Sequence, residues 1–204
     1  TTVAALTARV PEVLGKHYEI TYPGRQWNTA RSLRQVPLHD VWKAKNAFFG
    51  QVFGFERPLY FGAVDAPVPT FGRPDWFGQV AAEVAAAHGA AGVTELSSFG
   101  KIDVSGPDAL ACLEKICTNR IDRPVGRACY TLMLNRQGGI ESDLTVFRLA
   151  GDRFHLVVGT AALKRDMSWI RNNLPAGASV EVTDVTSDLA VLGLCGPHSG
   201  RLAS

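Results

Sequence analysis

The clearest pattern in the sequence is a helical one over residues 75–89. Apolar side chains recur there at spacings of three and four, which puts four of them on one face of a helix: Phe77, Val80, Val84 and Ala87. Asp75 precedes this stripe as a possible N-cap, and Gly89 follows it as a possible C-cap. The same reasoning predicts helices over residues 107–119 and 160–175.

Alternation of apolar and polar residues with a period of two predicts strands through the rest of the second half. The predicted strands are 93–106, 128–135, 140–150, 153–159, 179–188 and 189–196. Residues 136–139, Arg-Gln-Gly-Gly, supply glycines for the turn of a hairpin. Because the helices are segregated from strands that follow one another closely, we expect an α+β fold with a mostly antiparallel sheet.

Residues 1–62 differ from the rest of the chain, and residues 21–40 show no sustained period. Residues 21–40 are rich in Arg, Pro and turn formers, and residues 41–63 combine a short amphipathic piece with a glycine-punctuated aromatic strand. We interpret these aromatic residues as core filling, with a pocket wall as the alternative. Three prolines within residues 67–74 indicate an irregular connector. We therefore predict two parts, residues 1–62 and 63–204.

The strand after the double glycine carries the candidate chemistry. If its pleat is regular, one face consists of Glu141, Asp143, Thr145 and Phe147. This mixed face is typical of a solvent-exposed strand, but a carboxylate beside an aromatic ring also suits a flat heteroaromatic ligand. The pattern leaves open whether Tyr130 and Leu132 on the partner strand line the same side.

Composition narrows the function classes. The chain has 204 residues, 46% of them hydrophobic and 20% charged, with a formal charge of +2, as expected of a globular domain. Lys and Arg are scattered among acidic residues, so no nucleic acid or anionic membrane partner is expected. Neither an apolar run of about 20 residues nor the layout of a secretory signal is present. We expect a soluble, intracellular protein.

Several kinds of site are missing from the sequence. It contains no GxGxxG dinucleotide fingerprint, no GxxxxGK[ST] phosphate loop and no GxSxG nucleophile elbow. The five histidines form no close pair, and His155 is expected to be a satisfied or surface residue. The cysteines match no metal or disulfide spacing, so we expect no metal site and four buried, reduced thiols: Cys112, Cys117, Cys129 and Cys195.

Four motifs, in order, resemble the aminomethyltransferase family, the folate-binding T-protein of glycine cleavage. They are SSFGKIDVSGPDA (97–109), YTLMLNRQGGIESDLTVFRL (130–149), WI (169–170) and LGLCGP (192–197). The closer resemblance is to the form fused to FAD-dependent sarcosine and dimethylglycine dehydrogenases and oxidases, because residues 30–61 are similar to the junction in those enzymes. The resemblance identifies residues 1–62 as the tail of a flavoprotein central domain with its junction segment. Residues 63–204 are then the amino-terminal part of a T-protein-like folate-binding domain.

The resemblance also implies roles for single residues. Asp143 matches the family carboxylate that contacts N10 of tetrahydrofolate, and we predict it to be the catalytic residue. Tyr130 and Phe99 match walls of the pterin site, and Thr145 and Phe147 complete the predicted folate-binding set. We expect the Asp143 carboxylate to point into a cleft that admits a reduced pterin.

Two positions depart from the family pattern. Glu95 stands where relatives usually have Asp, and Gly159 replaces an asparagine of the simpler T-proteins. The contact that this asparagine makes with the pterin is therefore not expected here.

The implied function is one-carbon transfer. An FAD-dependent enzyme oxidises an N-methylated glycine derivative, and tetrahydrofolate captures the methyl-derived carbon as 5,10-methylenetetrahydrofolate, with release of the amine and a proton. FAD and the amine would bind in the flavin domain of the same polypeptide, outside these residues. We expect a cytoplasmic location, or the mitochondrial matrix in a eukaryote.

Two alternatives stay open. The chain could belong to a stand-alone glycine cleavage aminomethyltransferase or folate-dependent demethylase, although the resemblance of residues 30–61 argues against this. It could also belong to a non-catalytic folate-binding regulatory protein or an iron–sulfur-maintenance relative. Since the relatives continue with a second lobe after the segment matching residue 204, we expect this fragment alone to be inactive and to expose apolar surface.

Overall fold

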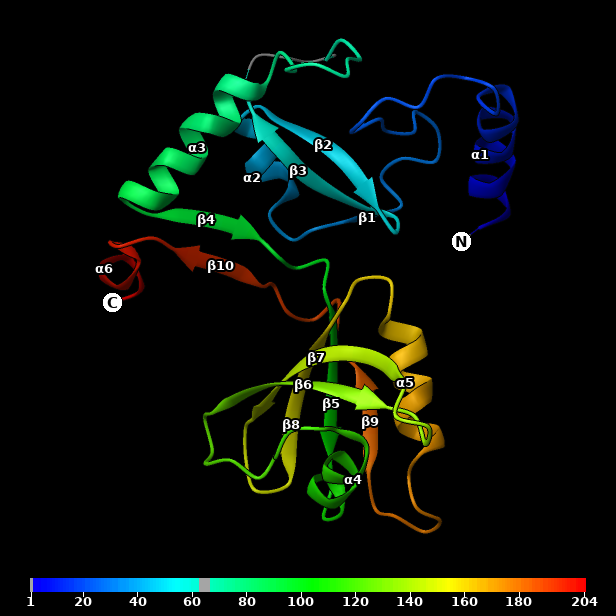
Figure 1. Ribbon diagram of the computed structural model, residues 1–204, viewed down its shortest axis with the longest axis vertical. Helices are drawn as coiled ribbons and strands as arrows, with labels where there is room; N and C mark the ends of the chain where they lie inside the picture. Colours follow the sequence, from blue (N-terminus) through cyan, green and yellow to red (C-terminus); the bar gives the residue numbers. More distant parts are fainter. Residues whose placement is uncertain (1, 63–66) are drawn as a thin grey trace. The chain divides into compact units, whose positions relative to one another are not determined.

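The computed structural model describes residues 2–62 and 67–204, which fold into two compact units. One unit runs to Leu96 and resumes at Ala190, and the other is the continuous segment Ser97–Leu189. The strands pair mostly antiparallel and lie beside helices, as predicted for the α+β class (Figure 1). Residues 63–66, where the second predicted part begins, lie outside the described residues. In the described ranges no helix combines the length and apolarity needed to cross a membrane.

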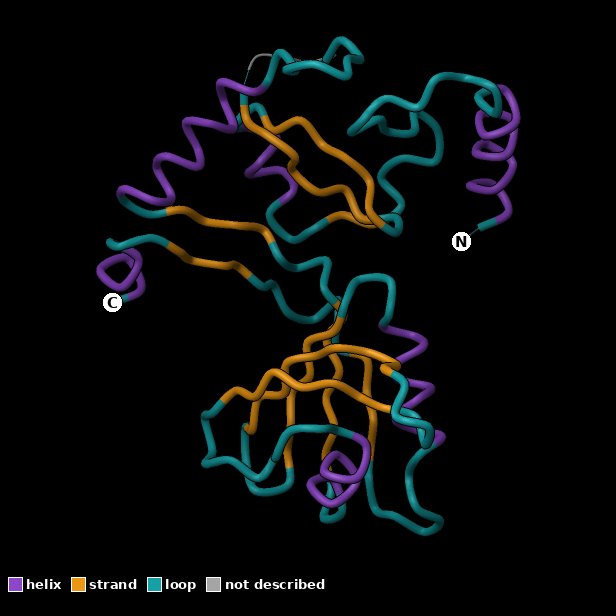
Figure 2. Tube along the Cα trace, in the orientation of Figure 1, coloured by secondary structure: helices purple, strands orange, loops and turns teal. Residues whose placement is uncertain are grey.

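The first unit contains a three-stranded sheet and a two-stranded ribbon. In the sheet, β3 pairs antiparallel with β2 and parallel with β1, and in the ribbon β4 pairs antiparallel with β10. Loops occupy the stretch between α1 and β1 (Figure 2). The elements are α1 (Val3–Gly15), β1 (Arg34–Gln35), α2 (His39–Ala44), β2 (Ala47–Val52), β3 (Phe55–Phe61), α3 (Phe77–Gly89), β4 (Gly92–Glu95), β10 (Leu192–Cys195) and α6 (Ser199–Ala203).

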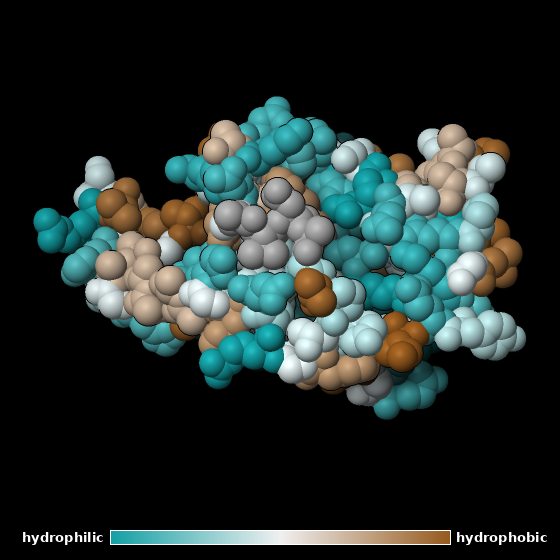
Figure 3. Space-filling view, turned by 90° about the horizontal axis from the view of Figure 1, so that it is seen from above, coloured by the Kyte–Doolittle hydropathy of each residue, from teal (hydrophilic) through white to brown (hydrophobic). Residues whose placement is uncertain are grey.

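The helix α1 was not predicted, since residues 1–62 were interpreted only as the tail and junction segment of a flavoprotein central domain. It buries only Ala5 and exposes a stripe of apolar residues: Val3, Leu6, Val10, Val13 and Leu14. Their spacings of three and four are a helical signal, which Pro11 inside the helix interrupts. On the face shown in Figure 3, hydrophobic residues are interspersed with hydrophilic ones. Such a mixture is normal for a protein surface.

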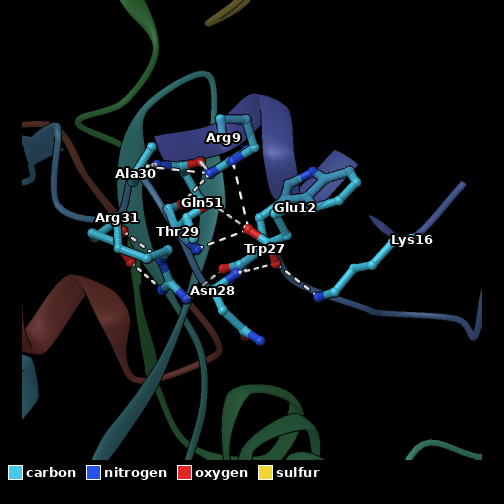
Figure 4. A network of polar contacts seen from close by, with 10 residues as sticks. Arg9, Glu12, Lys16, Trp27, Asn28, Thr29, Ala30, Arg31 and Gln51 are labelled. Carbon is cyan, nitrogen blue, oxygen red and sulfur yellow. Dashed lines mark hydrogen bonds and ion pairs between the residues drawn. The ribbon is translucent and has the colours of Figure 1, made fainter. Parts of the chain in front are cut away.

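Glu12 fastens α1 to the loop that follows it (Figure 4). Its carboxylate accepts hydrogen bonds from the backbone N–H groups of Asn28 (2.8 Å) and Thr29 (2.9 Å) and from Lys16 Nζ (2.7 Å). Burial alone would raise the pKa of Glu12, but these bonds outweigh it and hold the pKa well below the usual range. The ionised carboxylate is therefore part of the fold.

Replacing Glu12 with glutamine is expected to reduce the free energy of unfolding at pH 7 by about 2 kcal/mol, because charge-assisted hydrogen bonds are lost. Since the folded-state pKa of Glu12 is depressed, its contribution is present above the ordinary value of 4.5 and is lost as the pH falls below it. Urea unfolding of both proteins at pH 7 and at pH 3 measures the difference. If the difference in the free energy of unfolding between wild type and Glu12→Gln is the same or larger at pH 3, the ionised Glu12 carboxylate is not the source of the stability.

A buried ion pair joins the first loop to β3. Glu56 is 2% exposed, and its carboxylate accepts hydrogen bonds from Arg31 Nε (2.8 Å), from a second guanidinium nitrogen of Arg31 and from the Ser32 N–H (2.7 Å). Burial opposes ionisation, but these contacts prevail and lower the pKa of Glu56. The loop is thus attached to the sheet by a carboxylate that is almost completely shielded from water.

The second unit is built on a five-stranded antiparallel sheet in the order β6-β7-β8-β5-β9 (Figure 1). Its elements are β5 (Gly100–Ser105), α4 (Ala109–Ile116), β6 (Ala128–Leu134), β7 (Ile140–Arg148), β8 (Arg153–Val158), α5 (Leu163–Asn172) and β9 (Glu181–Asp184). The helices α4 and α5 share one hydrophobic core with one face of the sheet. We call the other face of this sheet the open face.

Several predicted boundaries were wrong, three of them at the start of an element or inside it. Residues 93–106 do not form one strand but two, β4 and β5, which belong to different sheets and are separated by a turn. The helix predicted over 75–89 begins at Phe77, so Trp76 and not Asp75 occupies the N-cap, and Ala90 and not Gly89 occupies the C-cap. In the third case α4 begins after Asp108, which occupies its N-cap. Local propensity sets such ends weakly, and tertiary packing decides them.

The four cysteines are free, as predicted, but they are not all buried. Cys112 and Cys129 are buried, Cys117 is half-buried, and Cys195 is exposed. The last difference arises because β10 lies in a two-stranded ribbon, which leaves much of its surface uncovered. Burial raises the pKa of the Cys117 thiol to about 12, so this group stays protonated at neutral pH.

Candidate functional site

The candidate site begins at the hairpin between β6 and β7. The side chain of Asn135 closes the turn, because its Oδ1 accepts hydrogen bonds from the N–H groups of Gln137 (3.0 Å) and Gly139 (2.9 Å). Gly138 has φ +81°, a left-handed conformation that glycine adopts without strain. Asn135 Nδ2 also donates to Glu141 (2.8 Å), so the start of β7 is fixed to the turn.

The alternation predicted for β7 is present. Ser142, Leu144 and Val146 are buried, whereas Asp143 and Phe147 are exposed and Thr145 is half-buried. The side chains of Asp143, Thr145 and Phe147 therefore lie on the open face.

The register of the hairpin answers the question that the sequence left open. Tyr130 pairs with Thr145, and Leu132 pairs with Asp143. Directly opposed residues project to the same side of a sheet, so Tyr130 and Leu132 also lie on the open face. Tyr130 is 61% exposed. The hairpin thus collects an aromatic ring, an apolar side chain and a carboxylate on one surface.

Tyr130 and Asp143 interact directly. The Tyr130 hydroxyl donates a hydrogen bond to Asp143 Oδ2 over 3.2 Å. The hydrogen bond to this carboxylate and its negative charge raise the pKa of Tyr130, so the phenol stays protonated and remains a donor. A carboxylate that is fixed on one side and exposed to solvent can accept a hydrogen bond from an N–H group of a ligand.

A second row of side chains crosses the open face beyond Thr145. Phe147 pairs with His155, which in turn pairs with Asp103 on β5. His155 Nδ1 lies 2.7 Å from Asp103 Oδ1, and Arg153 contacts the other oxygen at 3.3 Å. His155 was predicted to be a satisfied or surface residue, and its contact with Asp103 agrees with the first of these.

Phe99 lies in the turn before β5 and is half-buried. The ammonium group of Lys101 donates hydrogen bonds to the carbonyl oxygens of Ser97 (2.7 Å) and Phe99 (3.2 Å). Lys101 is 0% exposed, so these bonds fix the turn from within the protein. Gly159 directly follows the end of β8, where Val158 pairs with Leu144 of β7 and Gly100 of β5.

Asp143 itself is exposed on the open face. Two open hollows of the same unit lie away from Asp143. One borders α4 at Pro107, Leu110, Ala111, Glu114, Arg120 and Asp122, and the other borders the turns at 105–106 and 178–181. The cleft expected around Asp143 therefore stays a prediction. Nor do the described residues gather three or more His, Cys, Asp or Glu side chains into a group suited to a metal ion.

A buried carboxylate on the core side of β7 was not predicted from the sequence. Ser142 Oγ donates a hydrogen bond to Asp166 Oδ2 over 2.6 Å, and Asp166 is 1% exposed. A signal existed, because Asp166 falls on the same helical face as Leu163, Met167 and Ile170 in an otherwise apolar stripe. A carboxylate in such a stripe indicates a buried polar contact.

Two family descriptions match the chain. Residues 38–204 match the GCVT N-terminal domain, and residues 1–35 match the FAD dependent oxidoreductase central domain. These matches confirm the resemblance both to the T-protein family and to the flavoprotein central domain.

Three curated relatives align with nearly the whole chain. It is 38% identical over 203 residues to the 4-methylaminobutanoate oxidase (formaldehyde-forming) of Paenarthrobacter nicotinovorans, covering 98% of this chain and 24% of that protein. It is 34% identical over 202 residues to the mitochondrial pyruvate dehydrogenase phosphatase regulatory subunit of Mus musculus, covering 95% of this chain and 23% of that protein. It is 30% identical over 207 residues to the mitochondrial dimethylglycine dehydrogenase of Rattus norvegicus, covering 99% of this chain and 24% of that protein. The chain therefore spans about a quarter of the length of these relatives.

A solved structure supports the fold. The glycine cleavage system aminomethyltransferase T from Bartonella henselae superposes with a TM-score of 0.68 at 25% identity. The match covers 84% of this chain and 43% of that protein, as expected of a partial T-protein-like domain.

Proposed function

Because the chain belongs to the GCVT N-terminal domain family over residues 38–204, we propose that it is the tetrahydrofolate-binding, one-carbon-transferring portion of an FAD-dependent oxidoreductase. The substrate class is an N-methylated amine of the sarcosine and dimethylglycine type. The product is 5,10-methylenetetrahydrofolate. The match of residues 1–35 to a flavoprotein central domain supports this over a stand-alone aminomethyltransferase.

The observation that carries the proposal is the Tyr130–Asp143 pair on the open face of a family-matched sheet. Tetrahydrofolate supplies two nitrogen atoms that hold a one-carbon unit as a methylene bridge. The Asp143 carboxylate would accept a hydrogen bond from N10 and take up the N10 proton when this nitrogen bonds the one-carbon unit and the amine has left. Its negative charge would also stabilise positive charge that develops on nitrogen.

The neighbouring side chains suit the rest of the ligand. The rings of Tyr130 and Phe147 and the turn residue Phe99 offer aromatic surface to a pterin, and Thr145 lies opposite Tyr130 between them. An aromatic surface with one fixed polar group is a usual design for binding a flat ligand. These residues fit tetrahydrofolate in chemistry.

The full polypeptide is expected to purify with bound flavin and to oxidise sarcosine or dimethylglycine. With tetrahydrofolate present, the methyl-derived carbon should appear as 5,10-methylenetetrahydrofolate, and without it as formaldehyde. Flavin absorbance and a product assay under both conditions measure this. A flavin-free protein would contradict the flavoprotein assignment, and formaldehyde formation that tetrahydrofolate leaves unchanged would contradict the folate role.

A second candidate is a non-catalytic folate-binding regulator. The 34% identity to a mouse phosphatase regulatory subunit favours it, since the name of that relative describes a regulatory role. A regulator would bind 5-formyltetrahydrofolate in a titration but turn over none of the methylated amines. Turnover therefore separates the two candidates.

A further inference from the structure

A buried carboxylate lies directly behind the candidate catalytic residue. Ser142 is 5% exposed and projects into the core, opposite in direction to Asp143. Its hydroxyl donates to Asp166 Oδ2 over 2.6 Å, and Arg165 Nε and a terminal Arg165 nitrogen lie 3.3 Å from Asp166 Oδ1. The bond therefore connects the first turn of α5 to the backbone next to Asp143.

A buried carboxylate at position 166 fills the core less favourably than an apolar side chain would. Burial raises the pKa of Asp166, and the charge of Asp143 acts in the same direction. An apolar side chain at this position would pack with Leu163 and Met167, and such replacements of buried charges are often neutral or stabilising. Stability alone is thus a poor reason for the carboxylate, and a role in fixing local geometry is a better one.

The strand needs such a fixing point at Ser142. The β6–β7 register shifts between Met133 and Leu134, so Glu141 lies at an irregularity of the ladder. On the other side, pairing with β8 begins only at Leu144. The backbone of residues 141–143 therefore has a regular neighbour on one side only, next to a bulge, and bulges redirect side chains.

We propose that Ser142 and Asp166 are positioning residues that hold Asp143 in its direction on the open face. The inference rests on the proposed function of Asp143. Asp166 acts through the Ser142 hydroxyl and the backbone of β7, and it does not touch the ligand. A misplacement of about 1 Å in a catalytic group can reduce the rate by up to about 10²-fold. Fixing the backbone next to Asp143 should therefore have a measurable effect on the reaction rate.

The test uses Ser142→Ala in the full polypeptide. Its kcat for 5,10-methylenetetrahydrofolate formation is expected to fall about tenfold, with a smaller change in KM for tetrahydrofolate and no change in flavin reduction by the amine. Asp166→Asn, which keeps an oxygen acceptor for Ser142, should retain most of the activity, whereas Asp166→Leu should resemble Ser142→Ala. Cys112→Ala shortens another buried side chain of the same unit, on α4, and should leave product formation unchanged.

A double mutant separates positioning from general damage. In an Asp143→Asn background, Ser142→Ala should cause no further loss, because the pair acts through Asp143. A full tenfold loss in that background would overturn the inference. So would wild-type activity of Ser142→Ala beside an impaired Asp143→Asn, an outcome that leaves the proposed function intact.

Amide hydrogen exchange tests the anchoring without relying on catalysis. In Ser142→Ala the amides of residues 141–143 should exchange at least tenfold faster, while those of β8 keep their protection. Unchanged exchange at 141–143 would overturn the inference even if the folate reaction were absent. An Asp143→Asn variant as active as wild type would instead refute the role of Asp143 and the inference with it.

Discussion

Replacing Asp143 with alanine is expected to slow the formation of 5,10-methylenetetrahydrofolate by about 10²-fold. The carboxylate would both orient the ligand and accept a proton, and the protonated Tyr130 hydroxyl beside it cannot replace it as the proton acceptor. The comparison requires the full polypeptide with saturating amine. Flavin reduction by the amine should be unaffected, because the proposed function assigns that step to a flavin domain outside these residues.

Asp152 offers a matched control for this variant. It is an exposed aspartate in the turn between β7 and β8, outside the open face. Asp152→Ala removes the same charge from the same unit and should leave product formation at the wild-type rate. Equal rates for Asp143→Ala and wild type would remove Asp143 from the mechanism, and equal losses in both variants would point to a general charge effect.

The largest loss of stability is expected from replacing Glu56 with alanine. This change leaves the Arg31 guanidinium without its carboxylate and the Ser32 N–H without its acceptor. The site is shielded from solvent, since Glu56 is only 2% exposed. Breaking a buried pair in this way costs about 3 kcal/mol or more in the free energy of unfolding. Urea unfolding monitored by tryptophan fluorescence measures it, with Trp27 and Trp42 in the same unit as reporters.

The exposed pair Arg25–Glu19 provides the comparison. Its atoms approach to 2.6 Å, but the Glu19 side chain is 54% exposed. Solvent screens such a pair, so Glu19→Ala should cost less than about 1 kcal/mol. Similar losses for Glu19→Ala and Glu56→Ala would show that burial of Glu56 does not determine the effect.

The sequence predicted those features of the site that depend on local geometry. A pleat alternates with a period of two wherever a strand is regular, so the shared face of Asp143, Thr145 and Phe147 could be read from β7 alone. The register with β6 depends on the turn and on a bulge, so the position of Tyr130 required the structure.

Contacts between distant segments could not be predicted from local pattern. Asp166 meets Ser142 from 24 residues away, and Asp103 meets His155 from 52 residues away. The split of residues 93–106 between two sheets likewise depends on β10, which lies about a hundred positions later. In each case the partner is set by tertiary packing, which a single periodic window does not contain.

The pairing of β4 with β10 has a consequence for the order in which the protein forms during synthesis. Glu95 pairs with Leu192, and the Leu96 N–H donates to the Val191 carbonyl over 2.9 Å. The ribbon therefore joins the two segments that flank residues 97–189 in the sequence. The ribosome must therefore finish Ser97–Leu189 before that ribbon can exist. We expect the inserted unit to acquire protease resistance first in nascent chains stalled at successive lengths, and the segments flanking it to become protected together, only after Cys195 has emerged.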